Sequence, residues 1–253
     1  MKQPKMTGLQ LTGRIPKAGI TLYERGGRIV LRPSKSHQPK RRYRAVFIAQ
    51  QQQKHSSRLW TPLKWAGEPL FDKAPTAYAR FRSLMHRTPV VFTPKSGPMS
   101  GATFLLPGMP VSDGVLPVVE QWLDEVDGTP ALLTSLSAAD LLRGDLLRFY
   151  TLKQCTDSFC PLVRIKSDDL SISDFREVEG RLALVSDDFA DEMTGWALVH
   201  VRPKRKRGRQ PEYRCSSQTV VTRCTYYLPF TTEEALLAAA QTYGGLTEKS
   251  SHH

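Results

Sequence analysis

Two tracts of closely spaced lysine and arginine are the residues of this sequence best suited to ligand chemistry. Residues 39–44 read PKRRYR, and residues 202–209 read RPKRKRGR. Lysine and arginine neutralise phosphates and release their counterions, which gives affinity without base preference. Tyr43, within the first tract, could also stack on a base. The predicted phosphate contacts are Lys40, Arg41, Arg42, Arg44, Lys204, Arg205, Lys206, Arg207 and Arg209.

The charge of the chain is divided unevenly along its length. Residues 1–95 carry 20 basic and 3 acidic side chains, a balance of +17. Residues 96–253 carry 16 basic and 21 acidic side chains, a balance of −5. Within them, residues 202–214 hold 7 basic and 1 acidic side chains, so the remainder stands at −11. Such asymmetry bears on partners and solubility rather than on fold.

The sequence gives little support for catalysis or metal binding. The histidines lie in polar basic stretches, in the C-terminal tail, at the end of an expected helix (His86) or within an expected strand (His200). The acidic run SDDFADEM at 186–193 lacks the ligand spacing and the glycine of an EF-hand calcium loop. No glycine-rich phosphate-binding loop is present. We therefore expect no enzymatic activity, no cofactor and no metal.

The four cysteines are best explained as reduced thiols of a cytoplasmic protein. Cys155 and Cys160 have four intervening residues, and Cys215 and Cys224 have eight, so neither pair matches the C-x2-C spacing of a zinc knuckle. A hairpin disulfide between Cys155 and Cys160 is the main alternative. No apolar run approaches the roughly 20 residues of a membrane span, and the basic N-terminus lacks the apolar core of a signal peptide. We expect a cytoplasmic protein with no membrane partner.

The elements that would position the first tract are an arm and two helices. Residues 1–44 contain 12 basic residues and one acid, and ITLYERGGRIVLRPS within them predicts a small hairpin with a glycine turn. Residues 45–89 predict a helical hairpin. Its first helix has an apolar stripe broken by QQQQKHSS and is kinked or ended by Pro62. Its second starts at Pro75 and carries the stripe Ala77, Tyr78, Phe81, Leu84 and Met85.

The second tract belongs to a region that predicts an antiparallel β-sandwich, so the fold class is mainly β with α. Residues 90–230 consist of short apolar or alternating runs, including PVVFTP at 89–94 and ATFLLPG at 102–108, separated by glycine and proline turns. The basic tract lies between expected strands at 196–201 and from Tyr213, which predicts the tip of a hairpin.

A C-terminal helix is expected to close the sandwich. Thr231 and Glu234 predict a capping box, and Gly244-Gly245 predict the end of the helix. The side chains predicted to pack on the sandwich are Leu236, Leu237, Ala240 and Tyr243. The domains are then an arm at 1–44, a helical hairpin at 45–89, a sandwich with its helix at 90–245, and a disordered tail at 246–253.

Three stretches of the sequence resemble a group of uncharacterised proteins of Bacteroidetes. They are GWALVHV with the later RCSSQTVVTRCTYYLPFTTEEALLAAAQTYGG, FLLPGMPVSDGVLP, and ITLYERGGRIVLRPSKSHQPKRR. The resemblance covers most of the chain. It implies a bacterial source, an arginine-rich N-terminal region and a β-rich C-terminal domain of unknown function, and it implies no active site.

These observations predict non-catalytic binding of nucleic acid or another polyanion through the arm and the hairpin tip. Phosphates, rather than base edges, would supply the contacts. The alternative is a structural subunit, phage-like or filamentous, that forms homo-oligomers when the basic arm docks on the acidic body of a neighbour.

Overall fold

The computed structural model describes residues 13–15, 20–25, 28–33, 43–67, 70–71, 76–156, 160–204 and 212–247. The chain divides into two compact units, residues 1–41 and 42–253. The first unit is an antiparallel sheet in the order β1-β2-β3, formed by Gly13–Ile15, Ile20–Arg25 and Arg28–Pro33. Arg25 lies opposite Arg28, so only two residues connect β2 to β3. The predicted hairpin is confirmed, and β1 adds a strand that the sequence did not indicate.

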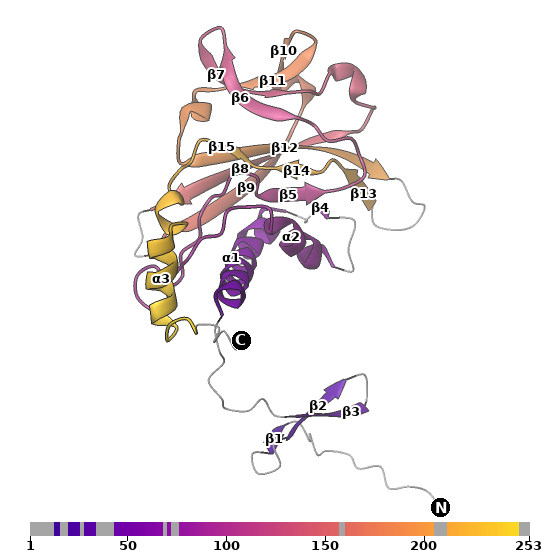
Figure 1. The fold of residues 1–253 in the computed structure, drawn as a ribbon. Coiled ribbons are helices and arrows are strands. Elements are labelled where there is room, and N and C mark those ends of the chain that lie inside the picture. The colour runs from indigo at the N-terminus through magenta and orange to yellow at the C-terminus, as the bar shows by residue number, and fades with distance from the viewer. Residues whose placement is uncertain are drawn as a thin grey trace, which may run out of the picture. The chain divides into compact units, whose positions relative to one another are not determined.

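The second unit is built in layers around a central sheet, as Figure 1 shows. That sheet has the order β13-β12-β8-β9, and β15 also pairs with β12. Its strands are β8 (Leu146–Cys155), β9 (Leu162–Leu170), β12 (Thr194–Lys204), β13 (Glu212–Cys215) and β15 (Val221–Thr222). A second antiparallel sheet, in the order β10-β11-β7-β6, covers one of its faces (Figure 1).

The strands of this second sheet are β6 (Gln121–Val126), β7 (Thr129–Thr134), β10 (Arg176–Val178) and β11 (Arg181–Val185). On the opposite side of the central sheet lie α1 (Arg44–Ala66) and α2 (Ala77–Met85) (Figure 1). With them is a small sheet in the order β14-β5-β4, formed by Gln218–Thr219, Pro110–Asp113 and Leu70–Phe71. The predicted class, mainly β with helices at both ends of the second unit, is confirmed.

The strand β12 contributes to two cores because its side chains alternate between the two faces of the central sheet. In β12, Trp196 and Leu198 pack into the core between the two sheets. Ala197 and Val199 belong to the core shared with α1 and α2. The face of Trp196 and Leu198 continues along the strand to His200, so a polar side chain is carried into the space between the sheets.

The expected strands at 89–94 and 102–108 are wrong. Both segments are described, and both run through the interior with Phe92 and Phe104 buried, but neither forms a strand. Proline bounds or interrupts each segment and cannot donate to a ladder. Their backbone groups are paired singly instead, as where the amide of Phe92 donates to the carbonyl of Phe230 at 2.8 Å.

Polar side chains on the inner face of α1 supply other partners for these two segments. Gln51 Oε1 accepts a hydrogen bond from the amide of Thr93 at 3.2 Å. His55 Nε2 lies 3.2 Å from the carbonyl oxygen of Phe104, and it must carry the proton because a carbonyl only accepts. The polar stretch that interrupts the apolar stripe of α1 is therefore part of its buried face.

Of the two alternatives at Pro62, a kink or an end of the first helix, the end is wrong because α1 continues to Ala66. Proline removes one helical hydrogen bond, but Leu59 and Leu63 on either side of it are buried in the core. The second helix is confirmed, and Phe81 and Met85 of its predicted stripe are buried. It begins at Ala77 with Thr76 as its N-cap, later than the predicted start at Pro75, which lies outside the described residues. The two helices contact through Trp60, whose ring lies 5.6 Å from that of Tyr78 and 5.3 Å from that of Phe81.

The C-terminal helix, α3 (Glu233–Thr242), differs from its prediction in its start and in its partners. Thr232, not Thr231, is the N-cap, and it accepts from the amide of Ala235. Thr231 is unsuited because it ends the preceding 3-10 turn in an α-region conformation. The end at Gly244-Gly245 is confirmed, since both have positive φ.

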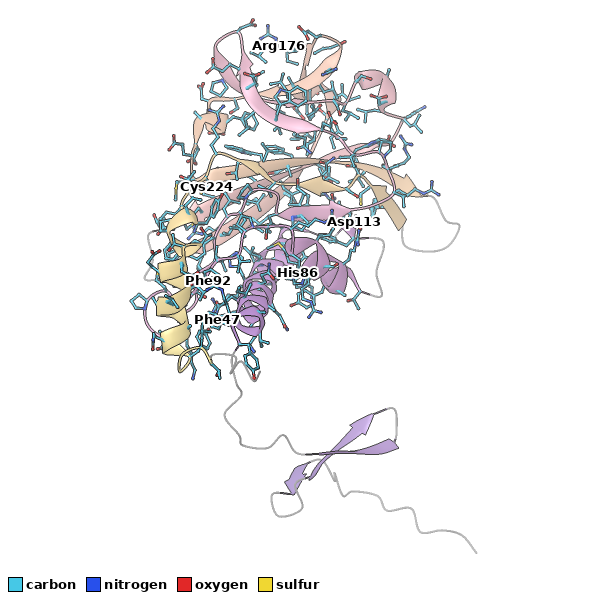
Figure 2. All side chains as sticks on the ribbon, in the orientation of Figure 1. Phe47, His86, Phe92, Asp113, Arg176 and Cys224 are labelled. Carbon is cyan, nitrogen blue, oxygen red and sulfur yellow. The ribbon has the colours of Figure 1, made fainter. Side chains whose placement is uncertain are left out.

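The helix α3 packs on the start of α1 rather than on the sandwich. Leu236 and Ala240 are buried with Phe47 and Phe92, whereas Leu237 is 49% exposed. Figure 2 shows Phe47 and Phe92 beside α3, and their rings are 6.4 Å apart. The four cysteines, all of them described, form no disulfide, so the alternative of a Cys155–Cys160 bridge is wrong.

Candidate functional site

Of the nine predicted phosphate contacts, Arg44 and Lys204 lie within the described part of the chain. Arg44 is the first residue of α1, and Lys204 is the last residue of β12. The other seven lie outside the described residues: Lys40, Arg41, Arg42, Arg205, Lys206, Arg207 and Arg209. The structure therefore locates the two elements that adjoin the basic tracts. The first tract ends where α1 begins, and the second starts within β12.

The second tract is held between paired strands. β12 and β13 are antiparallel, with Arg202 opposite Arg214, Pro203 opposite Tyr213, and Lys204 opposite Glu212. Residues 205–211 thus connect two strand ends that face each other across a ladder. This pairing confirms the predicted hairpin, and it places Lys204 at the point where the ladder ends.

The carboxylate of Asp145 fixes the base of this hairpin. Its Oδ2 lies 2.7 Å from Nε2 of His200 and accepts from Nη2 of Arg202 at 2.7 Å, while its Oδ1 accepts from Nε of Arg202 at 2.9 Å. The side chain of Asp145 is 3% exposed. Burial by itself raises the pKa of Asp145, but hydrogen bonds from Arg202, the Leu142 amide and His200 outweigh it and hold the pKa well below its ordinary value.

On the edge of β12 that faces away from β8, side chains also complete the hydrogen bonding between β15 and β13. β15 pairs with β12 at Trp196, and β13 begins its pairing at Val201. Between them, Gln121 accepts from the amide of Leu198 at 2.7 Å and donates to its carbonyl at 2.8 Å. The amide of His200 donates to Oγ of Ser216 at 3.1 Å, and its carbonyl accepts from the backbone amide of Ser216 at 2.9 Å. The strand is therefore fixed up to the residues that contact Asp145.

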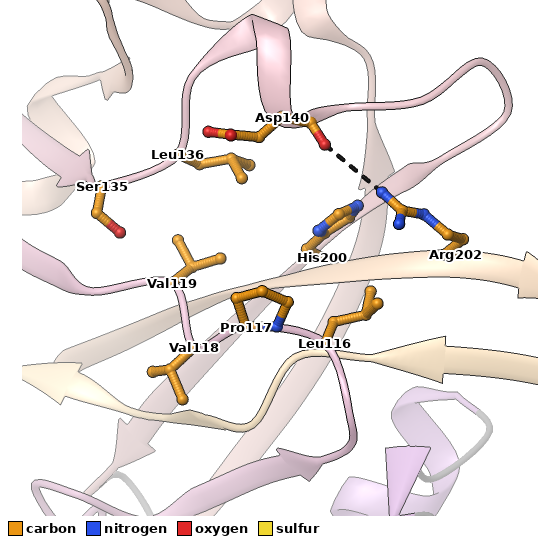
Figure 3. Close-up of a pocket in the computed structure, with 9 residues that line it drawn as sticks. All are labelled: Leu116, Pro117, Val118, Val119, Ser135, Leu136, Asp140, His200 and Arg202. Carbon is orange, nitrogen blue, oxygen red and sulfur yellow. Dashed lines mark hydrogen bonds between the residues drawn. The ribbon is translucent and has the colours of Figure 1, made fainter.

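A pocket of about 350 Å³ opens beside this cluster (Figure 3). One wall is the apolar stretch 116–119, and His200, Arg202 and Asp140 line the polar side. Figure 3 shows Arg202 reaching toward Asp140, whose carbonyl oxygen accepts from Nη2 of Arg202 at 3.5 Å. Asp140 is the last residue of a 3-10 turn, Ala138–Asp140. An imidazole oriented by a carboxylate is also an arrangement that suits proton transfer.

Arg44 is held at the opposite end of the chain's second unit. Its Nη1 donates to Oε1 of Glu233 at 2.6 Å, and its Nη2 donates to Oε2. The hydrogen bonds that Arg44 donates to Glu233 raise the pKa of Arg44 and lower the pKa of Glu233. Arg44 therefore binds a carboxylate of its own chain through two hydrogen bonds, which is the bidentate geometry that it would also use for a phosphate.

The sequence interpretation missed Asp145 and gave His200 no role. Asp145 lies in the region where the sequence predicts glycine and proline turns, and His200 is expected only to lie within a strand. A signal was nevertheless present, because His200 and Arg202 are two residues apart on a strand and must share a face. Two basic side chains that continue an apolar face require a buried acidic partner. The position of that partner, more than 50 residues away, depends on the pairing of β12 with β8.

Comparison with family models, with curated proteins and with solved structures gave no match. Within the described ranges, no group of three or more histidine, cysteine, aspartate or glutamate side chains is placed to hold a metal ion. A search of the described helices also found none with the length and apolar character needed to cross a membrane.

Proposed function

We propose that this protein binds nucleic acid or another polyanion, without catalysis, through its basic arm and the hairpin of β12 and β13. The observation that carries the proposal is the pairing of Lys204 with Glu212 at the end of the ladder. Because this pairing joins both ends of residues 205–211, four basic side chains are confined to one short connection: Arg205, Lys206, Arg207 and Arg209. A cluster of this kind binds phosphates mainly by charge.

The contacts of Arg202 suit a hairpin whose base is held by the protein and whose tip contacts phosphates. Its guanidinium is bound to Asp145, so its charge is neutralised within the protein. Arg214, directly opposite on β13, is exposed. The proposed phosphate contacts therefore begin beyond Arg202, and Asp145 acts as a positioning residue that holds the base of the hairpin. The setting that we propose is a bacterial cytoplasm.

The experiment is a salt titration of duplex DNA binding. In the test variant, Lys204, Arg205, Lys206 and Arg207 are replaced by serine. In the control, the same loss of charge is made at exposed residues outside both tracts, namely Arg82, Arg87, Arg181 and Arg223. Each lost phosphate contact reduces the slope of log K against log salt by about 0.9. We expect the slope to fall for the test variant and to fall much less for the control. Equal slopes for the two variants would remove the hairpin from the proposal.

A second candidate function is self-assembly, and a charged surface of the structure favours it. The sheet β10-β11-β7-β6 carries exposed acidic side chains along its strands and turns: Glu120, Asp124, Glu125, Asp127, Glu177 and Glu179. The basic arm of a neighbouring molecule could dock there. Light scattering distinguishes the two functions. In the absence of nucleic acid, an oligomer that dissociates as salt is raised supports self-assembly. A protein that is monomeric at low salt supports polyanion binding without self-assembly.

A further inference from the structure

A groove of about 590 Å³ runs between α1 and the edge of the central sheet. Pro62 and Trp65 of α1 form one side, and five consecutive residues of β9, 162–166, form the other. Consecutive residues of a strand point to opposite faces. A groove that all five of them line must therefore run along the edge of β9 rather than over one face. Its described lining includes none of the residues to which we assign polyanion binding.

The edge of β9 that borders the groove carries an outward-facing backbone. β9 is the last strand of its sheet in the described part of the chain. In an antiparallel pair, alternate residues direct their N–H and C=O groups toward the neighbouring strand and away from it. The amide of Val163 donates to Thr103 Oγ1 at 2.9 Å, which places Val163 in the outward set. Ile165, two residues on, therefore directs its N–H and C=O toward the groove.

The side chains around this edge differ on its two faces. On the α1 side, Ile165 lies beside the apolar groove wall that includes Trp65, and Trp65 is 81% exposed. On the other face, Arg164 and Lys166 are exposed. An added strand would place alternate side chains on each face, next to these neighbours. Apolar residues fit the first face and acidic residues the second.

A third basic residue of the groove, Arg58, is bound by backbone carbonyl groups. Arg58 donates to the carbonyl oxygen of Ala102 at 3.2 Å and to that of Ser100, so it is bound by neutral groups. Among the described residues, Arg58, Arg164 and Lys166 are the charged side chains that line the groove, and none of the lining residues is acidic. The charge of the groove therefore attracts an anionic ligand.

We propose that this groove binds an extended peptide of alternating apolar and acidic residues, which pairs with β9 as an additional antiparallel strand. This is strand addition at a sheet edge, in which backbone hydrogen bonds give affinity and alternate side chains give specificity. The peptide would pair from Ile165 onward, because Thr103 already binds the outward amide of Val163. The basic arm of this chain is excluded as the ligand by its charge. Nucleic acid matches the charge but has no peptide groups to pair with Ile165.

The test uses a fluorescein-labelled peptide of alternating valine and glutamate, with binding followed by anisotropy. Two N-methylated forms make the sharpest comparison. A residue opposite Ile165 lies on the α1 face, so in an antiparallel pair the valine amides donate to β9. Methylation of the valine amides should weaken binding at least about tenfold, whereas methylation of the glutamate amides should leave it nearly unchanged. If the two methylated peptides bind alike, strand addition is wrong.

Protein variants locate the site. Trp65→Ala and Lys166→Glu should each weaken the peptide about tenfold, and both positions are exposed, so folding is expected to be preserved. Val118→Ala and Arg181→Glu are the matched controls, at exposed positions away from the groove, and should bind as the unchanged protein does. A peptide with lysine in place of glutamate should not bind. The proposal is overturned if the lysine peptide binds equally, if the parent peptide does not bind, or if an oligothymidylate displaces it and depends on Trp65.

Discussion

Arg44, the first residue of α1, is joined by two hydrogen bonds to Glu233, the first residue of α3. The pair links the point where the chain leaves its N-terminal unit to the start of the last helix. Glu233 is also favoured at this position because a carboxylate stabilises the N-terminus of a helix. If Arg44 contacts a phosphate, as we propose, the phosphate competes with Glu233 for the same guanidinium.

This competition predicts that Glu233→Gln strengthens polyanion binding. The variant removes the carboxylate and releases Arg44, so the slope of log K against log salt should become steeper by up to about 0.9. Glu234→Gln is the matched control, because it changes the same charge on the next residue of α3, which is exposed. Duplex DNA titrations of both variants provide the measurement. Equal slopes for the two would show that Arg44 is not a phosphate contact.

The cluster at the base of the hairpin predicts a loss of stability in Asp145→Asn. Removing this buried carboxylate leaves Arg202 without its charged partner and weakens the hydrogen bond to His200. We expect the free energy of unfolding to fall by about 3 kcal/mol. Asp168→Asn, at an exposed carboxylate, should change it by less than about 0.5 kcal/mol. Urea denaturation of both variants at neutral pH tests this, and equal midpoints would contradict it.

The contribution of Asp145 to stability depends on pH. Folding lowers the pKa of Asp145 from its ordinary 3.8, so its contribution to stability is complete above that value and is lost as the pH falls toward the folded pKa. The stability difference between the unchanged protein and Asp145→Asn should therefore shrink below about pH 4. A difference that stayed constant in acid would mean that the charge of Asp145 is not what stabilises the hairpin base.

His55 predicts a second acid-sensitive range, at higher pH. Burial lowers its pKa from 6.5 to about 4, and Nδ1 of its ring has no hydrogen-bond partner among the described residues. Below pH 6.5, His55 is protonated in the unfolded chain but remains neutral in the folded protein. The free energy of unfolding therefore falls as the pH is lowered from 6.5 to about 4. The expected loss is about 3 kcal/mol. His55→Gln should flatten this part of the stability profile, as measured by urea denaturation across the range, and an unchanged profile would assign the acid sensitivity elsewhere.

Local patterns were enough to predict the strands that carry the site, but not the contacts that fix it. The alternation of β12 and the turn chemistry around it indicate a hairpin because they depend on neighbouring residues. Residues 89–94 have an equally apolar pattern, yet their partners are Gln51 and Phe230, which are distant in sequence. A pattern of burial does not reveal whether a ladder or separate side chains satisfy the backbone.

The same limit applies to the candidate site. The basic tracts are visible as charge, whereas the role of Asp145 depends on strand pairing that brings it to His200. Thr231 shows a limit of local motifs as well. It fits a capping box by spacing, but the preceding 3-10 turn holds it in a conformation that excludes an N-cap. Such neighbours become apparent only in the folded chain.

The final prediction separates stability from binding along the hairpin. The replaced residues Lys204, Arg205, Lys206 and Arg207 lie at or beyond the end of the ladder, and the core contacts of β12 end before them, at Val201. The four serine substitutions should therefore change the free energy of unfolding by no more than about 0.5 kcal/mol, while the salt slope of binding falls. Asp145→Asn should show the opposite pattern. It lowers the free energy of unfolding, but the tip retains its charges, so the salt slope of the folded protein stays near that of the unchanged protein. Thermal unfolding and DNA titration of the same two preparations give both quantities. A large loss of stability in the serine variant would show that the tip packs against the body, and its effect on binding would then no longer report phosphate contacts.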